Sequence, residues 1–207
     1  MYGVGGLSGV NAGSITNCFA DVRVRGSQQV GGLVGVNGSI INNCYTTGSV
    51  SGDGMVGGVV GDNYGSLTNC YATGAVSATM GGGGVIGGDG GDFETGKLSY
   101  CAALNPSISG LYCRRVGYCS TLTNNIAWSG MVPLSGATFG TGAGNNSEGA
   151  DKNKTEVKSQ ATYTALGWSF GSSEASPWKM GVSTYELPVF YWQTAAPAAM
   201  PAHLAGN

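Results

Sequence analysis

The apolar positions of this chain recur every 26 residues, and so do several glycines and small polar side chains between them. The positions that correspond at this spacing are Gly6, Gly32 and Gly58; Leu7, Leu33 and Val59; Ile15, Ile41 and Leu67; Asn17, Asn43 and Asn69; Cys18, Cys44 and Cys70; and Val24, Val50 and Val76. A fixed period of roughly 20–50 residues is typical of solenoid proteins, in which each repeat stacks on the next. The pattern therefore predicts a column of stacked coils.

Each unit is predicted to contain short β-strands. In the second unit, strand-forming residues occupy 32–36, 39–41 and 44–50, and glycine and asparagine separate them. Valine, isoleucine, threonine and tyrosine dominate these segments and glycine is dense, so helices are disfavoured. We therefore expect an all-β fold, a right-handed parallel β-helix of about five coils, because parallel crossovers are nearly always right-handed.

The spacing of the columns predicts where each coil bends. The columns that contain Ile41 and Cys44 lie three residues apart, so a corner must separate them if both point inward. Asn43 and its equivalents would occupy that corner and stack as an amide ladder, since neighbouring coils lie about 4.8 Å apart. The glycine column that contains Gly35 is expected to be a crowded inward site.

The repeat continues past the third unit with changes in spacing. Leu98 and Cys101 follow their equivalents by 31 residues, so we expect an insertion at 88–97 that protrudes from the column. A fifth coil can be traced through Leu122, with Asn125 in the place of the cysteine. The spacing between equivalent residues therefore changes from coil to coil in this part of the chain.

The chain is expected to divide into three parts. Residues 1–127 form the β-helix. Residues 128–193 contain an irregular loop, a short helix at 154–166 that ends at Gly167, and an aromatic segment that caps the open end of the last coil. Residues 194–207, which are rich in alanine and proline, are expected to form a flexible tail.

Composition and charge exclude several classes of protein. Hydrophobic residues make up 42% of the chain and charged residues 10%, whereas disordered chains combine low hydrophobicity with high charge. The net charge is −2 and no basic stripe is present, so nucleic acid is not an expected partner. No apolar run reaches the roughly 18 residues of a spanning helix, so membrane insertion is not expected. No signal peptide is recognisable, and we expect the chain to be part of a larger polypeptide.

Two sequence motifs resemble the GLUG repeat family. They are Gly-Gly-Leu-Val-Gly at 31–35 and Asn-Cys-Tyr-Thr-Thr-Gly-Ser-Val at 43–50, with a variant of the second at 69–76. The segments 103–108 and 167–170 look like those of gut Bacteroides-type members. Such repeats occur in bacterial surface and secreted proteins, including adhesins, and accompany some IgA-peptidase-type proteins. The resemblance implies an extracellular or cell-surface location and a structural or adhesive role, and it supplies no catalytic motif.

The six cysteines are interpreted mainly as core residues. Four of them fall on one inward column, where cysteine behaves as a small hydrophobic side chain: Cys18, Cys44, Cys70 and Cys101. Stacked neighbours have parallel Cβ directions, which favours free thiols over disulfides. Cys113 and Cys119 lie off this column, and a disulfide between them stays open. Zinc-binding spacings are absent, and no cofactor is expected.

The acidic residues provide weak candidates for a metal site or a catalytic site. Asp89, Asp92 and Glu94 share one glycine-rich insertion that can be a cation site or, as we prefer, a solvated loop. Polysaccharide lyases and hydrolases with β-helix folds carry paired carboxylates, so such an enzyme is the alternative interpretation. The only histidine is His203, in the predicted tail. We therefore expect a protein without enzymatic activity.

One aromatic column provides the candidate binding residues. If Cys44 points inward, its neighbour Tyr45 points outward, and Phe19, Tyr45 and Tyr71 form a stacked external stripe. Exposed aromatic faces bind sugars and partner proteins, so a host or matrix glycan or protein is the expected partner. In the alternative interpretation, the insertion or the C-terminal segment covers the stripe.

Overall fold

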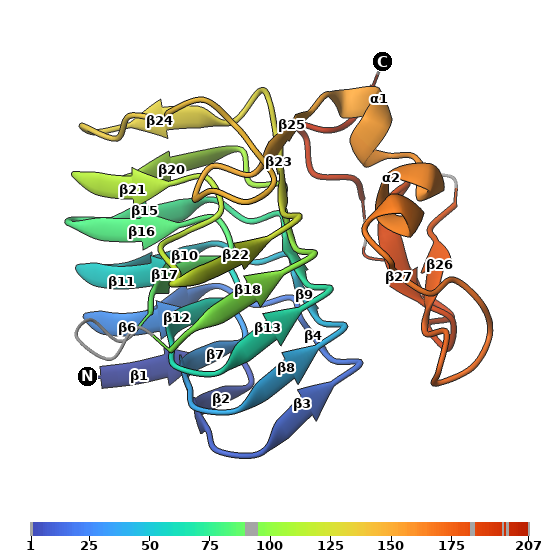
Figure 1. The fold of residues 1–207 in the computed structure, drawn as a ribbon, viewed down its shortest axis with the longest axis horizontal. Helices are drawn as coiled ribbons and strands as arrows, with labels where there is room; N and C mark the ends of the chain where they lie inside the picture. The colour runs from blue at the N-terminus through green and yellow to red at the C-terminus, as the bar shows by residue number, and fades with distance from the viewer. Residues whose placement is uncertain (1, 90–94, 183–184, 196, 198, 207) are drawn as a thin grey trace.

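The protein folds as the expected right-handed parallel β-helix (Figure 1). The computed structural model describes residues 2–89, 95–182, 185–195, 197 and 199–206. In this part of the chain, five parallel sheets run along the column, and each coil adds one short strand to a sheet. The three strand segments predicted for each unit are therefore divided further, because the coil bends more often than the sequence pattern indicated.

The sheets contain strands of two to four residues. The first sheet consists of β1 (Tyr2–Gly5), β6 (Gln28–Gly31), β11 (Gly54–Gly57), β16 (Gly81–Gly83) and β21 (Tyr112–Arg114). The second consists of β2 (Ser8–Asn11), β7 (Val34–Asn37), β12 (Val60–Asn63) and β17 (Ile86–Gly88). The third consists of β3 (Ser14–Thr16), β8 (Ile40–Asn42), β13 (Ser66–Thr68), β18 (Lys97–Ser99) and β22 (Thr121–Thr123).

Two further parallel sheets complete the column. The fourth consists of β4 (Phe19–Ala20), β9 (Tyr45–Thr46), β14 (Tyr71–Ala72), β19 (Ala102–Ala103), β23 (Ile126–Trp128) and β25 (Ala150–Lys152). The fifth consists of β5 (Val24–Arg25), β10 (Val50–Gly52), β15 (Val76–Ala78), β20 (Ser107–Ser109) and β24 (Val132–Leu134). The fourth sheet carries the predicted aromatic stripe and is called the aromatic sheet below.

Neighbouring coils pair in the register that the repeat predicts. Val30 pairs with Val56, 26 residues further along the chain. Leu67 pairs with Leu98 across the insertion, and Leu98 pairs with Leu122 in the next coil. The changes in spacing therefore alter the corners between strands and leave the columns aligned.

The predicted inward column forms the core. Leu33, Val59 and Val85 are fully buried. Leu7, their equivalent in the first coil, is 52% exposed because no described coil lies beneath it. The column thus continues to the N-terminal face of the β-helix and ends there as an apolar surface.

The glycine column is as crowded as predicted. A Cβ atom at Gly61 would lie 2.4 Å from the carbonyl carbon of Gln29 and 2.5 Å from the nitrogen of Val30. These are backbone atoms on β6, on the opposite side of the coil interior. Two sheets therefore approach each other so closely that a side chain has no room between them.

The predicted asparagine corner is confirmed, and its amide ladder is partial. Asn17, Asn43 and Asn69 have φ angles of 53°, 50° and 52°, in the left-handed region that asparagine tolerates. Asn69 donates to Asn43 at 3.3 Å, but the Oδ1 atom of Asn17 is buried without a partner. The corner is set by the backbone conformation rather than by a continuous ladder.

A second asparagine column, which sequence reasoning missed, forms the continuous ladder. Asn11 donates to Asn37 at 2.7 Å, and Asn37 donates to Asn63 at 2.7 Å, and all three side chains are buried. These residues also follow the 26-residue period, so the signal was present in the sequence. A buried amide is tolerated here because each one hydrogen-bonds its neighbour one coil away.

The cysteines are free thiols, as expected for the inward column. Cys70 accepts from the backbone nitrogen of Cys44 at 3.3 Å, and Cys101 accepts from that of Cys70 at 3.4 Å. Asn125 takes the same role above Cys101, with its Oδ1 atom 2.9 Å from the nitrogen. Cys113 and Cys119 are also free, so the disulfide that the sequence left open is not formed.

The β-helix extends beyond the predicted boundary at residue 127. β24 pairs with β20, and β25 pairs with β23, so much of the segment expected to be an irregular loop forms a partial sixth coil. The backbone nitrogen of Val116 donates to the carbonyl oxygen of Ser147 at 3.0 Å. The hydrogen-bonding edge of the fifth coil is satisfied in this way.

The remaining described residues, 153–182, 185–195, 197 and 199–206, form a segment that we call the lateral cap. It contains α1 (Lys154–Val157), α2 (Gln160–Ala165) and an antiparallel pair, β26 (Trp178–Met180) and β27 (Pro188–Phe190). Figure 1 shows these elements beside the column, along the aromatic sheet. The prediction that this segment caps the open end of the last coil is therefore wrong, because its aromatic side chains pack against the aromatic stripe instead.

The predicted helix at 154–166 is present but divided. Asn153 caps α1 in a reciprocal arrangement with Glu156, and Ser159 begins α2. Gly167 follows α2 with a φ angle of +86°, which confirms the predicted helix end. The division at Ser159 turns the chain so that both Val157 and Tyr163 are buried in the cap.

The predicted flexible tail folds back onto the molecule. Leu204 is fully buried, and the Nε2 atom of His203 lies 2.7 Å from the carbonyl oxygen of Leu104. Lys154 donates to the carbonyl oxygen of Ala205 at 3.0 Å. The tail prediction is therefore wrong for these residues, because one leucine and one histidine provide enough contact to dock it.

Candidate functional site

The aromatic stripe predicted from the repeat is formed on the outside of the aromatic sheet. The ring centroids of Phe19 and Tyr45 lie 5.2 Å apart, and those of Tyr45 and Tyr71 lie 4.9 Å apart. The planes of Tyr45 and Tyr71 differ by only 2°. Parallel strands place equivalent side chains one above another, so the backbone register enforces the stacking.

The lateral cap covers most of this stripe. Tyr45 and Tyr71 are fully buried, and the ring of Trp178 lies 6.3 Å from the first and 6.1 Å from the second. Trp168 and Phe190 pack beside Trp178 with centroid distances of 4.7 Å each. The expectation that Tyr45 and Tyr71 present an exposed face is therefore wrong, and the alternative, cover by the C-terminal segment, is the observed arrangement.

The two tyrosine hydroxyl groups are fixed at this interface. Gln193 donates to the hydroxyl oxygen of Tyr45 at 2.7 Å, and Tyr71 donates to the carbonyl oxygen of Pro188 at 2.6 Å. Burial raises the pKa of Tyr45 to about 12 and raises that of Tyr71 well above its ordinary value. Both groups therefore remain neutral and act as anchors of the cap.

The end of the stripe remains open to solvent. Phe19 is 38% exposed and Trp192 is 48% exposed, and their ring centroids lie 6.2 Å apart. Trp192 also stacks on Phe190 at 5.3 Å with an angle of 13° between the planes. We call the pair Phe19 and Trp192 the aromatic edge. Sequence reasoning selected Phe19 but not Trp192, whose only signal was the aromatic run at 190–192.

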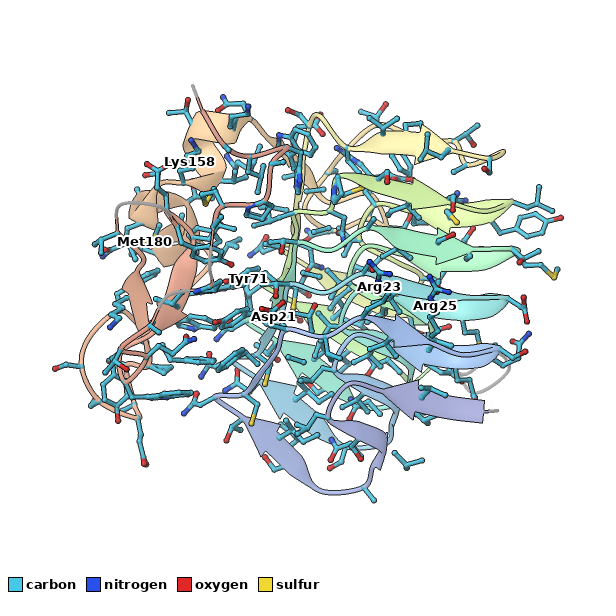
Figure 2. The ribbon with its side chains drawn as sticks, turned by 180° about the vertical axis from the view of Figure 1, so that it is seen from behind. Asp21, Arg23, Arg25, Tyr71, Lys158 and Met180 are labelled. Carbon is cyan, nitrogen blue, oxygen red and sulfur yellow. The ribbon has the colours of Figure 1, made fainter. Side chains whose placement is uncertain are left out.

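A small cavity lies at the boundary between the column and the cap. Its volume is about 220 Å³, and its lining residues are Asp21, Thr47, Thr73, Tyr185, Pro197, Ala199 and Pro201. In Figure 2, Asp21 and Tyr71 both lie on the side of the column that faces the cap. The hydroxyl group of Thr47 donates to the carboxylate of Asp21 at 2.5 Å.

The acidic insertion gives no metal site within the described residues. Asp89 accepts a hydrogen bond from Ser120 at 2.6 Å. Asp92 and Glu94, the other two candidates, lie outside the described residues. Across the described part of the chain, no group of three or more histidine, cysteine or acidic side chains is arranged to hold a metal ion.

A charge cluster near the C-terminal end of the column, in which Arg115 and Glu148 are buried and Asp151 is exposed, was not foreseen. The side chain of Arg115 is 2.5 Å from Asp151, and its backbone nitrogen donates to Glu148 at 3.1 Å. The partners lie 33 and 36 residues away along the chain, in a segment without the repeat, so no spacing signal could have paired them. The cluster fastens the partial sixth coil to the fifth.

The helices of the described chain are all too short or too polar to cross a membrane. The longest of them, α2, has six residues.

Comparisons with known proteins agree with this architecture. A model of the GLUG motif matches the chain three times, at residues 2–25, 26–51 and 52–77. A search of curated proteins found no match. Among solved structures, a Bacteroides ovatus protein described as a "putative immunoglobulin A1 protease" is similar, with a TM-score of 0.67 and 24% sequence identity. The match covers 87% of this chain and 58% of that protein, and at this identity it shows the fold alone. The three tandem matches show that the first three coils of the column are GLUG repeats.

Proposed function

We propose that this chain is a structural and adhesive module of a larger bacterial cell-surface or secreted protein, and that it binds glycans at the aromatic edge. The observation that carries the proposal is the exposed pair of rings, Phe19 and Trp192, at the end of a stack that is otherwise buried. GLUG repeats and a fold shared with a Bacteroides ovatus protein support a bacterial surface or secreted context.

The aromatic edge is suited to sugar rings because it is already rigid before a ligand binds. Phe19 stacks on Tyr45, and Trp192 stacks on Phe190, so each exposed ring has one face held by a buried neighbour. The apolar face of a pyranose packs on an aromatic ring in the same way as another apolar surface. Little side-chain entropy is lost on binding when the rings are already ordered.

The proposal assigns no catalytic step to this chain. Its one histidine, His203, is bound to the carbonyl oxygen of Leu104 and packs on Trp128 at 4.8 Å. The pKa of His203 is lowered, mainly by burial, so the ring is a neutral packing group. The alternative, a polysaccharide lyase or hydrolase, requires paired carboxylates on one face of the coils. The protease description of the Bacteroides ovatus protein belongs to that protein.

Binding to immobilised glycans and to mucin tests the proposal. Wild-type protein should bind at least one glycan, and Trp192→Ala should weaken that binding about tenfold, the effect of losing roughly 1.4 kcal/mol of stacking. Phe19→Ala should have a smaller effect in the same direction. Tyr112→Ala is the matched control, since Tyr112 is 61% exposed but lies on β21, away from the aromatic sheet.

Four outcomes would contradict the proposal. Unchanged binding by Trp192→Ala would place the site elsewhere, and equal loss in Tyr112→Ala would indicate a general effect of aromatic exposure. Release of soluble products from a bound glycan would favour the enzyme alternative. A protein partner in place of a glycan would appear as binding to deglycosylated mucin that the same variant abolishes.

A further inference from the structure

The cavity at the boundary of the column and the cap has a composition that points to a ligand. One wall is a column of equivalent positions, Asp21, Thr47 and Thr73, each two residues after a ring of the aromatic stripe. The opposite wall combines Tyr185 with three apolar residues of the folded-back tail: Pro197, Ala199 and Pro201. At about 220 Å³, the cavity is smaller than the roughly 300–1,000 Å³ of sites for drug-sized ligands, so it accommodates one side-chain-sized group.

The polar atoms of the cavity are mostly hydrogen-bond acceptors. Thr47 uses its one proton to donate to Asp21. Tyr71 donates its proton to Pro188, so the 3.1 Å contact between the two tyrosine hydroxyls makes Tyr185 the donor. The carboxylate oxygens of Asp21 and the hydroxyl oxygens of Thr47 and Tyr185 therefore retain lone pairs for a ligand.

One buried hydroxyl group in the cavity wall has no partner. Thr73 is only 3% exposed, and its Oγ1 atom makes no hydrogen bond in the described structure. A buried polar atom without a partner costs roughly 1–3 kcal/mol, so it marks a position that a ligand group can satisfy. Asp21 makes no ion pair within the described residues, and its negative charge acts on both Tyr45 and Tyr185.

These features select a cation with several donors and an apolar stem. An ammonium group carries three donors and no acceptor, which matches a wall of oxygen lone pairs beside one carboxylate. The proline and alanine wall fits the methylene groups of a long side chain. A calcium ion prefers six to eight oxygen ligands, more than this half-apolar wall supplies. We propose that this cavity binds a primary ammonium group on an alkyl stem, the side chain of a lysine on a partner polypeptide.

Titration with Nα-acetyl-lysine methylamide, followed by amide chemical shifts, tests the proposal. Saturable shifts are expected at Thr47 and Thr73, and the affinity should fall as salt is added. Asp21→Asn should weaken binding at least tenfold, and Thr73→Val should weaken it several-fold. Asp53→Asn is the matched control, because Asp53 is also an exposed carboxylate that accepts from a threonine and a serine, yet it does not line the cavity.

Further probes separate this ligand from others. The neutral analogue Nα-acetyl-norleucine methylamide should not bind, the arginine analogue should bind less tightly, and glucosamine should bind less tightly than the lysine analogue. Equal binding of the neutral analogue, unchanged affinity in Asp21→Asn, or tighter binding of the arginine analogue or glucosamine would overturn the proposal. Trp192→Ala should leave lysine binding unchanged, so this test is independent of glycan binding at the aromatic edge.

Discussion

The column and the lateral cap are built on opposite plans. In the column, buried contacts join residues one coil apart, such as Asn11 and Asn37, and the interior is filled by small aliphatic residues, glycine and cysteine. In the cap, contacts join distant residues, such as Tyr45 and Gln193, 148 positions apart, and the core is aromatic. The column therefore derives its order from repetition, whereas the cap derives its order from one matching surface.

This difference predicts how a single substitution should affect the stability of each region. A coil is supported by identical neighbours above and below, so one altered position disturbs two similar contacts. The cap meets the column mainly at Tyr45 and Tyr71, and a single ring between them, Trp178, contacts both. Loss of that ring should release the cap and leave the column folded.

The largest effect is expected for Trp178→Ala. The side chain is fully buried, packs on four rings and donates to Asn43 at 3.2 Å. Its removal should destabilise the cap by about 4 kcal/mol, in the range for buried tryptophan. Hydrogen exchange should show rapid exchange in 153–206 and preserved protection in the column. Trp192→Ala, which removes a half-exposed ring, is the control. In this variant, both regions should keep their protection from hydrogen exchange. Equal loss of protection in the column would show that the two regions unfold together.

A somewhat smaller effect is expected for Gly61→Ala in the column. The new Cβ atom would meet backbone atoms of Gln29 and Val30, which have no rotamer to move. The cost should be about 3 kcal/mol, measured by chemical denaturation with circular dichroism. The control is Gly13→Ala, because a Cβ atom at Gly13 meets nothing within 4 Å. Similar stabilities of the two variants would refute the close approach of the two sheets.

The amide ladder should contribute less than the packing of the glycine column. Asn37→Ala leaves the amides of Asn11 and Asn63 each without one partner and should cost about 2 kcal/mol. Asn42→Ala is the comparison, because the Oδ1 atom of Asn42 already lacks a partner. Its stability should change by less than about 0.5 kcal/mol. If Asn37→Ala were as stable as the wild-type protein, the amide ladder would not be needed to align the coils.

The smallest effect concerns the docking of the C-terminal tail on the column, where His203 contacts Leu104 and Trp128. Burial lowers the pKa of His203 below its ordinary 6.5, so the released tail takes up a proton before the docked tail does. Docking should therefore be at full strength above about pH 6.5 and weaken as the pH falls below it. As His203 is the only histidine, its NMR titration is unambiguous. A midpoint at or above 6.5, or the same pH dependence in His203→Gln, would contradict this assignment.

The column was predictable from the sequence because each position of a coil recurs with a similar residue in several coils. The alignment of Leu98 and Leu122 and the substitution of Asn125 for cysteine followed from spacing and are confirmed. The ladder through Asn37 carried the same signal and was overlooked. Repetition thus determines both the fold and the register.

The candidate site was predictable only in part, because half of it comes from the cap. The stacking of Phe19 on Tyr45 followed from the repeat, but the cover over Tyr45 depends on residues more than 100 positions away. Nothing in the spacing placed Trp192 beside Phe19 or Tyr185 beside Asp21. Contacts between a periodic and an aperiodic segment leave no pattern in one sequence.

The constant 26-residue register has a consequence for how such proteins change over generations. Unequal crossing-over between similar DNA repeats adds or deletes whole units, and a whole unit enters the column with every pair, such as Val30 with Val56, already matched. Copy number can therefore drift without loss of folding. The two units that carry Tyr45 and Tyr71 are the exception, because the loss of either would also remove the surface on which the cap packs. Selection should therefore preserve both units.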